Sequence, residues 1–146
     1  MIQRIQSIFL LLAAAAVFAL FALPFGTSDN AIADSALFND QVFNMQDHVG
    51  LLALFCGAGA ITFAAIFMFN NRPLQLTLSR VAIIANVIGI ILGVVLFMRD
   101  SPAMGAAVPN EEFGLGMPIL SILFAALAMR SINKDDKLVK SMDRLR

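Results

Sequence analysis

The sequence VGLLALFCGAGAITFAAIFMF, residues 49–69, decides the fold class, because it contains twenty-one consecutive residues without a charge. At about 1.5 Å per residue, a helix of this length crosses the roughly 30 Å hydrocarbon layer of a bilayer. Polar residues 70–72 follow it directly, and Pro73 suits the first turn of a next helix that Asn71 is placed to cap. Residues 49–69 are therefore predicted to form a transmembrane helix.

Three further apolar runs flank this one, at about residues 8–24, 81–98 and 113–129. The composition agrees with them, since 60% of the 146 residues are apolar and only 14% are charged, far from the average of soluble domains. We predict a single all-α domain over residues 1–146, a polytopic membrane protein whose four transmembrane helices form an antiparallel bundle.

The first apolar run also has a competing interpretation as a secretory signal peptide. Ala31, Ile32 and Ala33 fit the small-residue pattern of a cleavage site, but they lie about eight residues beyond the apolar run, which is itself slightly long for a signal peptide. Only one base, Arg4, precedes the run. These features favour an uncleaved first helix.

The last stretch, RSINKDDKLVKSMDRLR at residues 130–146, sets the orientation, because it holds six of the ten Lys and Arg residues. In the four-helix topology Arg4, Arg72 and Arg80 lie on the same side as this stretch, and Arg99 alone lies on the other. Segments rich in Lys and Arg stay in the cytoplasm. Both termini are therefore predicted to be cytoplasmic.

The same stretch, residues 130–146, has the pattern of an amphipathic helix. At 100° per residue its bases Lys137, Lys140 and Arg144 fall on one side. The apolar residues opposite are Leu138, Val139, Met142 and Leu145. We predict a cytosolic helix that contacts anionic lipid headgroups or another protein; the alternative is a solvated topology anchor.

The segment 25–48 contains four Asp residues and neither Lys nor Arg, which predicts an external loop, on the side of the membrane opposite the cytoplasm. Its stretch ALFNDQVFNMQ, residues 36–46, has apolar residues three to four apart, so it fits a short amphipathic helix on the outer surface. An ordinary loop fits equally well. Beyond residue 98, Pro102, Gly105 and Pro109 predict a second external loop of irregular structure.

Small residues recur within two of the predicted spans. Small side chains let helix backbones approach closely in a membrane. The positions are Ala85, Gly89 and Gly93 in the third span and Ala53 and Gly57 in the second. We therefore predict that these two spans pack together as a hairpin.

Polar side chains within the spans are few. Thr62, Asn86 and Ser121 lie five to eight residues from the cytoplasmic ends of their spans, so they fall near one level. They fit either a site for a small substrate or ion, or hydrogen bonding between helices. The second interpretation is favoured, because the four spans contain no ionisable residue.

The sequence gives no residues for catalysis, metal or cofactor binding. Cys56 and His48 are the only residues of their kinds, which excludes a redox pair, bis-His haem ligation and the usual zinc sets. Nucleotide-binding and hydrolase motifs are missing, and nothing indicates a nucleic acid as a partner. His48 and the loop aspartates are explained more simply as helix caps or solvated groups.

Three stretches resemble a family of bacterial four-pass membrane proteins known only as a domain of unknown function. They are MIQRIQS at residues 1–7, NRPLQLTLSR at residues 71–80, and the ending at residues 130–146. The resemblance implies an uncleaved first helix, four spans and a plasma (inner) membrane location. It brings no catalytic residues.

We expect a non-enzymatic integral membrane protein that serves as a scaffold or accessory subunit of a larger membrane assembly. Its partners would be the lipid bilayer and other membrane protein subunits. The alternative is a small transporter or channel that uses the polar layer of Thr62, Asn86 and Ser121.

Overall fold

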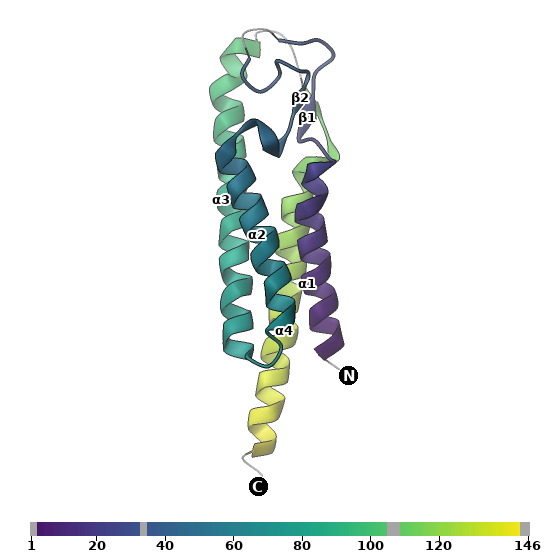
Figure 1. The fold of residues 1–146 in the computed structure, drawn as a ribbon, viewed down its shortest axis with the longest axis vertical. Coiled ribbons are helices and arrows are strands. Elements are labelled where there is room, and N and C mark those ends of the chain that lie inside the picture. The colour runs from purple at the N-terminus through teal and green to yellow at the C-terminus, as the bar shows by residue number, and fades with distance from the viewer. Residues whose placement is uncertain (1–2, 33–34, 105–108, 144–146) are drawn as a thin grey trace.

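The structure is a computed structural model that describes residues 3–32, 35–104 and 109–143. Four α-helices dominate it: α1 (Gln3–Phe18), α2 (Val49–Phe67), α3 (Arg72–Met104) and α4 (Gly116–Asp143). Each helix packs along its neighbours in the chain, and α1 also packs along α4, so the four helices close into a ring (Figure 1). Helix α1 begins and α4 ends at one end of the bundle, here called the terminal end. The opposite end carries the short strands and is called the cap end.

Three of the helices contain an apolar segment long enough to cross a membrane: Val49–Phe67, Arg72–Asp100 and Phe113–Val139. Helix α1 continues into the short 3-10 helix η1 (Ala19–Phe21), and together they contribute a fourth, shorter apolar segment, Ile5–Phe21. The prediction of four helices packed together is confirmed, and three of the four have the length of a full span.

Helix α3 begins where the sequence predicts and ends later. Asn71 caps it, because its Oδ1 accepts a hydrogen bond from the backbone N–H of Leu74 at 3.2 Å. The expectation that the helix stops near residue 98 is wrong, since α3 continues through Arg99 and Pro102 to Met104. In Figure 1 this extra part of α3 rises above the other helices at the cap end.

A contact with the segment between α1 and α2 explains the extension of α3. The carboxylate of Asp100 accepts a hydrogen bond from the Ser35 hydroxyl. It also accepts the backbone N–H groups of Ala36, at 3.0 Å, and Leu37, at 3.2 Å. Three donors from another part of the chain thus hold the final turns of α3, and no local sequence pattern reports such a contact.

The segment between α1 and α2, residues 25–48, forms most of a small cap on the bundle, and β3 completes it. Strand β1 (Gly26–Thr27) lies between β2 (Val42–Phe43) and β3 (Asn110–Glu111), and it pairs antiparallel with both. Two further 3-10 helices, η2 (Met45–Asp47) and η3 (Phe113–Leu115), lead into α2 and α4. The central strand therefore joins the α1–α2 connection to the α3–α4 connection.

The amphipathic helix considered for residues 36–46 is wrong. Those residues form a turn, then β2 and the start of η2, and Gln41 has a positive φ of 71° that an α-helix does not allow. Four of their apolar side chains, Leu37, Phe38, Phe43 and Met45, are buried in a hydrophobic core under the cap. This core contains Val17, Leu20, Phe25, Leu37, Phe38, Phe43, Met45, Leu51 and Phe55.

Candidate functional site

Buried polar side chains line the interior of the bundle between the middle and the terminal end. Each of the four helices contributes at least one of them. They are Gln6, Thr62, Gln75, Ser79, Asn86, Ser121 and Asp135. The surface shows the opposite character, because the outward positions of α3 and α4 are mostly exposed aliphatic side chains. Polar side chains inside the bundle and apolar ones on its surface are compatible with a protein surrounded by lipid.

The three polar residues singled out in the spans are all buried, and the structure brings two of them together. The side-chain amide of Asn86 donates to the hydroxyl of Ser121 at 3.4 Å and to the backbone carbonyl of Ala82 at 3.0 Å. Thr62 donates to the carbonyl of Ala58 in its own helix, at 2.7 Å. Asn86 therefore links α3 to α4, whereas the hydroxyl of Thr62 hydrogen-bonds to the backbone of its own helix, α2.

Sequence reasoning missed four buried polar residues toward the terminal end. Gln75 donates from its side-chain amide to the carbonyl of Ala65 at 3.0 Å, which ties the start of α3 to the end of α2. Ser79 donates to the carbonyl of Gln75 at 2.9 Å. Gln6 donates to the carboxylate of Asp135, which joins α1 to α4. The bundle interior thus extends further toward this end than the predicted spans.

A regular spacing on α3 could have indicated part of this set. The inward positions recur at intervals of three and four residues, as on one face of a helix. They are Gln75, Ser79, Ala82, Asn86, Gly89 and Gly93. Gln75 and Ser79 lie before the apolar run, so the predicted span left them out, and Asp135 was counted with the solvated tail.

Two of the small-residue positions receive side chains from α2. A Cβ atom on Gly89 would lie 2.8 Å from the ring of Phe55, and one on Gly93 would lie 3.8 Å from Leu51. Ala85 is half-buried, Ala53 is exposed, and a Cβ atom on Gly57 would meet no atom within 4 Å. The ring of Phe55 on α2 therefore packs over Gly89 on α3. The two helices do not meet through a row of small residues on each of them.

The predicted contact residues of the tail that the structure describes lie on α4, which continues without a break from the bundle (Figure 1). Lys137 and Leu138 are exposed. Lys140 and Met142 belong to the same helix, and Arg144 and Leu145 lie outside the described residues. The part of this stretch nearest the bundle has one buried face, which carries Ile132 and Asp135.

The side chains before α2 act as caps. His48 accepts the N–H of Gly50 at its Nδ1, at 3.0 Å, and Asp47 accepts the N–H of Asn44 at 2.6 Å. Burial raises the pKa of Asp47, the hydrogen bond from Asn44 acts against this, and the negative charge of nearby Asp40 adds to the rise. Among the described residues, no three His, Cys, Asp or Glu side chains are grouped to hold a metal ion.

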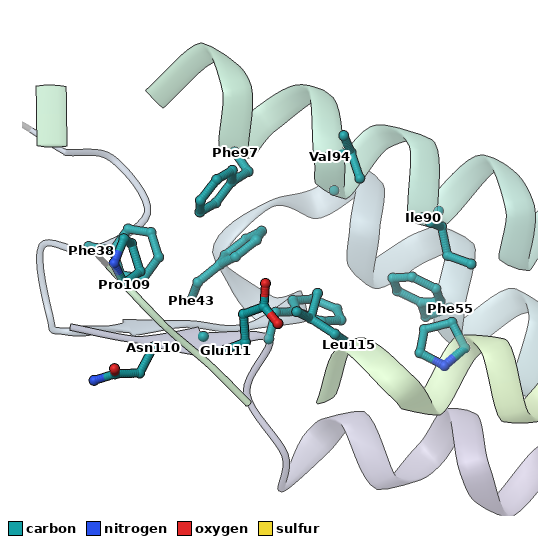
Figure 2. A pocket seen from close by; sticks show the side chains of 15 residues that line it. Phe38, Phe43, Phe55, Ile90, Val94, Phe97, Pro109, Asn110, Glu111 and Leu115 are labelled. Atoms are coloured by element: carbon teal, nitrogen blue, oxygen red, sulfur yellow. The ribbon is translucent and has the colours of Figure 1, made fainter. Parts of the chain in front are cut away.

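A cavity of about 410 Å³ lies at the cap end, between α3, the start of α4 and the cap. Figure 2 shows the rings of Phe43, Phe55 and Phe97 and the side chain of Leu115 around it. The rest of the lining comes from the cap, α3 and α4, and it includes Phe25, Phe38, Gly89, Ile90, Gly93, Val94 and Pro118. Polar side chains enter the lining only at Asn110 and Glu111, in β3. No pattern in the sequence indicated this cavity.

Three long apolar helices packed with a fourth define the class, a helical-bundle protein compatible with a membrane. The family model described as Domain of unknown function (DUF4293) matches residues 2–145, and the chain belongs to that family. This confirms the resemblance noted in the sequence. No curated protein and no solved structure gave a significant match.

Proposed function

We propose that this chain is a non-enzymatic integral protein of the bacterial plasma (inner) membrane that acts as a scaffold or accessory subunit of a larger membrane assembly. Both termini would lie in the cytoplasm. The distribution of bases supports this orientation, because Arg72 and Arg80 lie toward the terminal end, on the side of the basic residues of α4, while Arg99 lies near the cap end.

One observation carries the proposed role as a subunit, namely the exposed apolar side chains on the projecting end of α4. Leu138 and Val139 are 46% and 43% exposed, and they follow the turn of α4 where Asp135 meets Gln6 of α1. Lys137 lies beside them and is exposed as well. Adjacent apolar and basic side chains beyond the bundle form a surface that another protein can cover.

The alternative function, a small transporter or channel, has weaker support in the geometry. The lining of the cavity at the cap end does not include Thr62, Asn86 or Ser121. The side-chain amide of Asn86 instead donates to the hydroxyl of Ser121 and to the backbone carbonyl of Ala82, as side chains do when they join helices.

The proposal is tested by site-specific cross-linking in cells. A photoreactive amino acid replaces Leu138, and an affinity tag is inserted between Asn30 and Ala31, which are both exposed. The matched control carries the photoreactive residue at Leu123, an exposed position on the apolar part of α4. We expect position 138 to give a cross-linked adduct of one defined mass between this chain and a partner protein. Position 123 should give no adduct of the same mass.

Purification in mild detergent through the same tag gives an independent measurement. A partner that co-purifies in fixed stoichiometry, and that carries the cross-link from position 138, would support an accessory subunit. Recovery of the chain as a free monomer, with no adduct at position 138, would contradict the proposal.

A further inference from the structure

The cavity at the cap end has the features of a lipid-binding site. We propose that it binds one acyl chain of a phospholipid with an amine headgroup, taken from the outer leaflet of the membrane. This inference rests on the membrane location proposed above, but not on the role as a subunit. Four observations carry it: the lining, the volume, the position of the opening and the charge at the rim.

The lining and the volume suit a hydrocarbon chain. Five phenylalanine rings, contributed by the cap, α2 and α3, surround the space together with aliphatic side chains. Ligand pockets in proteins measure about 300–1,000 Å³, and the cavity, at about 410 Å³, falls in this range. An apolar chain that fills it would replace empty space with van der Waals contacts.

The opening lies on the lipid-facing surface of the bundle. The cavity-lining side chains Val94, Leu115 and Phe97 are 51%, 44% and 37% exposed. On α3 they are continuous with Ile91 and Val95, which are exposed and apolar. A ligand therefore enters sideways from the acyl chains of the bilayer, and a water-soluble substrate would have to cross an apolar rim.

The polar end of the cavity carries negative charge. Glu111 is exposed and belongs to the lining (Figure 2). Asn110, beside it, donates to Asp29 at 3.5 Å, and Glu112 accepts the Thr27 hydroxyl at 3.1 Å. Glu111 thus places a carboxylate in the lining, and the carboxylates of Asp29 and Glu112, which follow β1 and β3, are hydrogen-bonded to residues of those two strands. They attract an ammonium group and repel the headgroup of an anionic lipid.

A larger side chain at Gly93 can fill the cavity without disturbing the fold. A Cβ atom there would meet only Leu51, at the ordinary contact distance of 3.8 Å, so a leucine at this position can extend into the cavity. Gly57 on α2 provides a matched control, because a Cβ atom there meets no atom within 4 Å and the residue does not line the cavity. Val94→Phe serves as a second variant that fills the space.

The experiment uses the full-length protein in lipid nanodiscs and a phosphatidylethanolamine with a photoreactive diazirine in one acyl chain. After illumination, labelled peptides are identified by mass spectrometry. We expect labelling of residues 89–97 and 109–118. Gly93→Leu and Val94→Phe should each lower this labelling about tenfold, equivalent to about 1.4 kcal/mol of binding, while Gly57→Leu leaves it unchanged.

The headgroup is tested with phosphatidylglycerol carrying the same acyl chain. We expect it to label the site less than phosphatidylethanolamine does, and Glu111→Gln should reduce the difference. Unchanged labelling in both filled variants, or equal labelling by the two lipids in the wild-type protein, would overturn the proposal. Circular dichroism and thermal unfolding confirm that each variant is folded. Because no partner protein takes part, failure here leaves the proposed subunit role untouched.

Discussion

Gln6 and Asp135 are 129 residues apart in the sequence, and the side-chain amide of the first donates a hydrogen bond to the carboxylate of the second. Both side chains are buried. The pair joins α1 to α4 and so closes the ring of helices near its terminal end. A carboxylate in this position depends on its partner, because a buried charge is costly unless it is hydrogen-bonded.

We predict that Asp135→Ala lowers the stability of the bundle by about 1–3 kcal/mol, because the amide of Gln6 loses its buried partner. The measurement is the thermal unfolding midpoint in detergent. Replacing both residues by leucine should restore much of the loss, since no polar group is then left without a partner. Asn133→Ala, at an exposed position on α4, is the control. Equal effects from the Asp135 and Asn133 substitutions would contradict the pairing.

Gly89→Ala is expected to destabilise the packing of α2 on α3. The new Cβ atom would lie 2.8 Å from the ring of Phe55, and overpacking of this kind costs about 1–3 kcal/mol. Gly57→Ala is the matched control, because nothing lies within 4 Å of its Cβ position. The shorter side chain of Phe55→Leu should rescue Gly89→Ala. A stability of Gly89→Ala equal to that of the control would show that α2 and α3 do not pack as described.

Asp100→Ala should loosen the cap. The carboxylate accepts three hydrogen bonds from residues 35–37, and hydrogen bonds to a charged group are worth about 1.5–3 kcal/mol each. We expect faster hydrogen exchange at the amides of Ala36 and Leu37, measured by mass spectrometry, with little change in α2. Arg99→Gln, a neighbouring exposed position, is the control. Unchanged exchange in Asp100→Ala would argue against this contact.

Leu138→Gln combined with Val139→Gln should reduce recovery of a partner protein without lowering the unfolding midpoint. Both side chains are largely exposed, so their replacement removes contact surface but little internal packing. Co-purification through the tag on the external segment measures the first effect and thermal unfolding the second. If partner recovery stays at the wild-type level, the projecting end of α4 is not the contact surface.

The helices could be predicted from the sequence because the patterns that indicate a helix lie within the helix itself or next to its ends. The uncharged run at residues 49–69 indicated α2, and Asn71 before Pro73 located the start of α3, which its hydrogen bond to Leu74 confirms. The family could also be identified, from stretches at the two ends and in the middle connection, and its model matches residues 2–145.

The remaining features depend on contacts between distant segments. The end of α3 is set by Asp100 and residues 35–37, and the burial of Asp135 is set by Gln6. The apolar residues of the external segment suggested an amphipathic helix, but strand pairing and the core under the cap decided their structure. The cavity draws its lining from the cap, α2, α3 and α4, so no single stretch of sequence could reveal it.

Strand β1 has one more consequence. Its two neighbours come from opposite halves of the chain, since β2 precedes α2 and β3 follows α3. The contacts of α1 with α4 and of α2 with α3 also bridge these halves. A chain cut between α2 and α3 would therefore retain a helical interface and a strand pair to guide its reassembly. Two separately expressed fragments divided at this connection should recombine into the complete bundle, which makes the protein a natural candidate for fragment complementation.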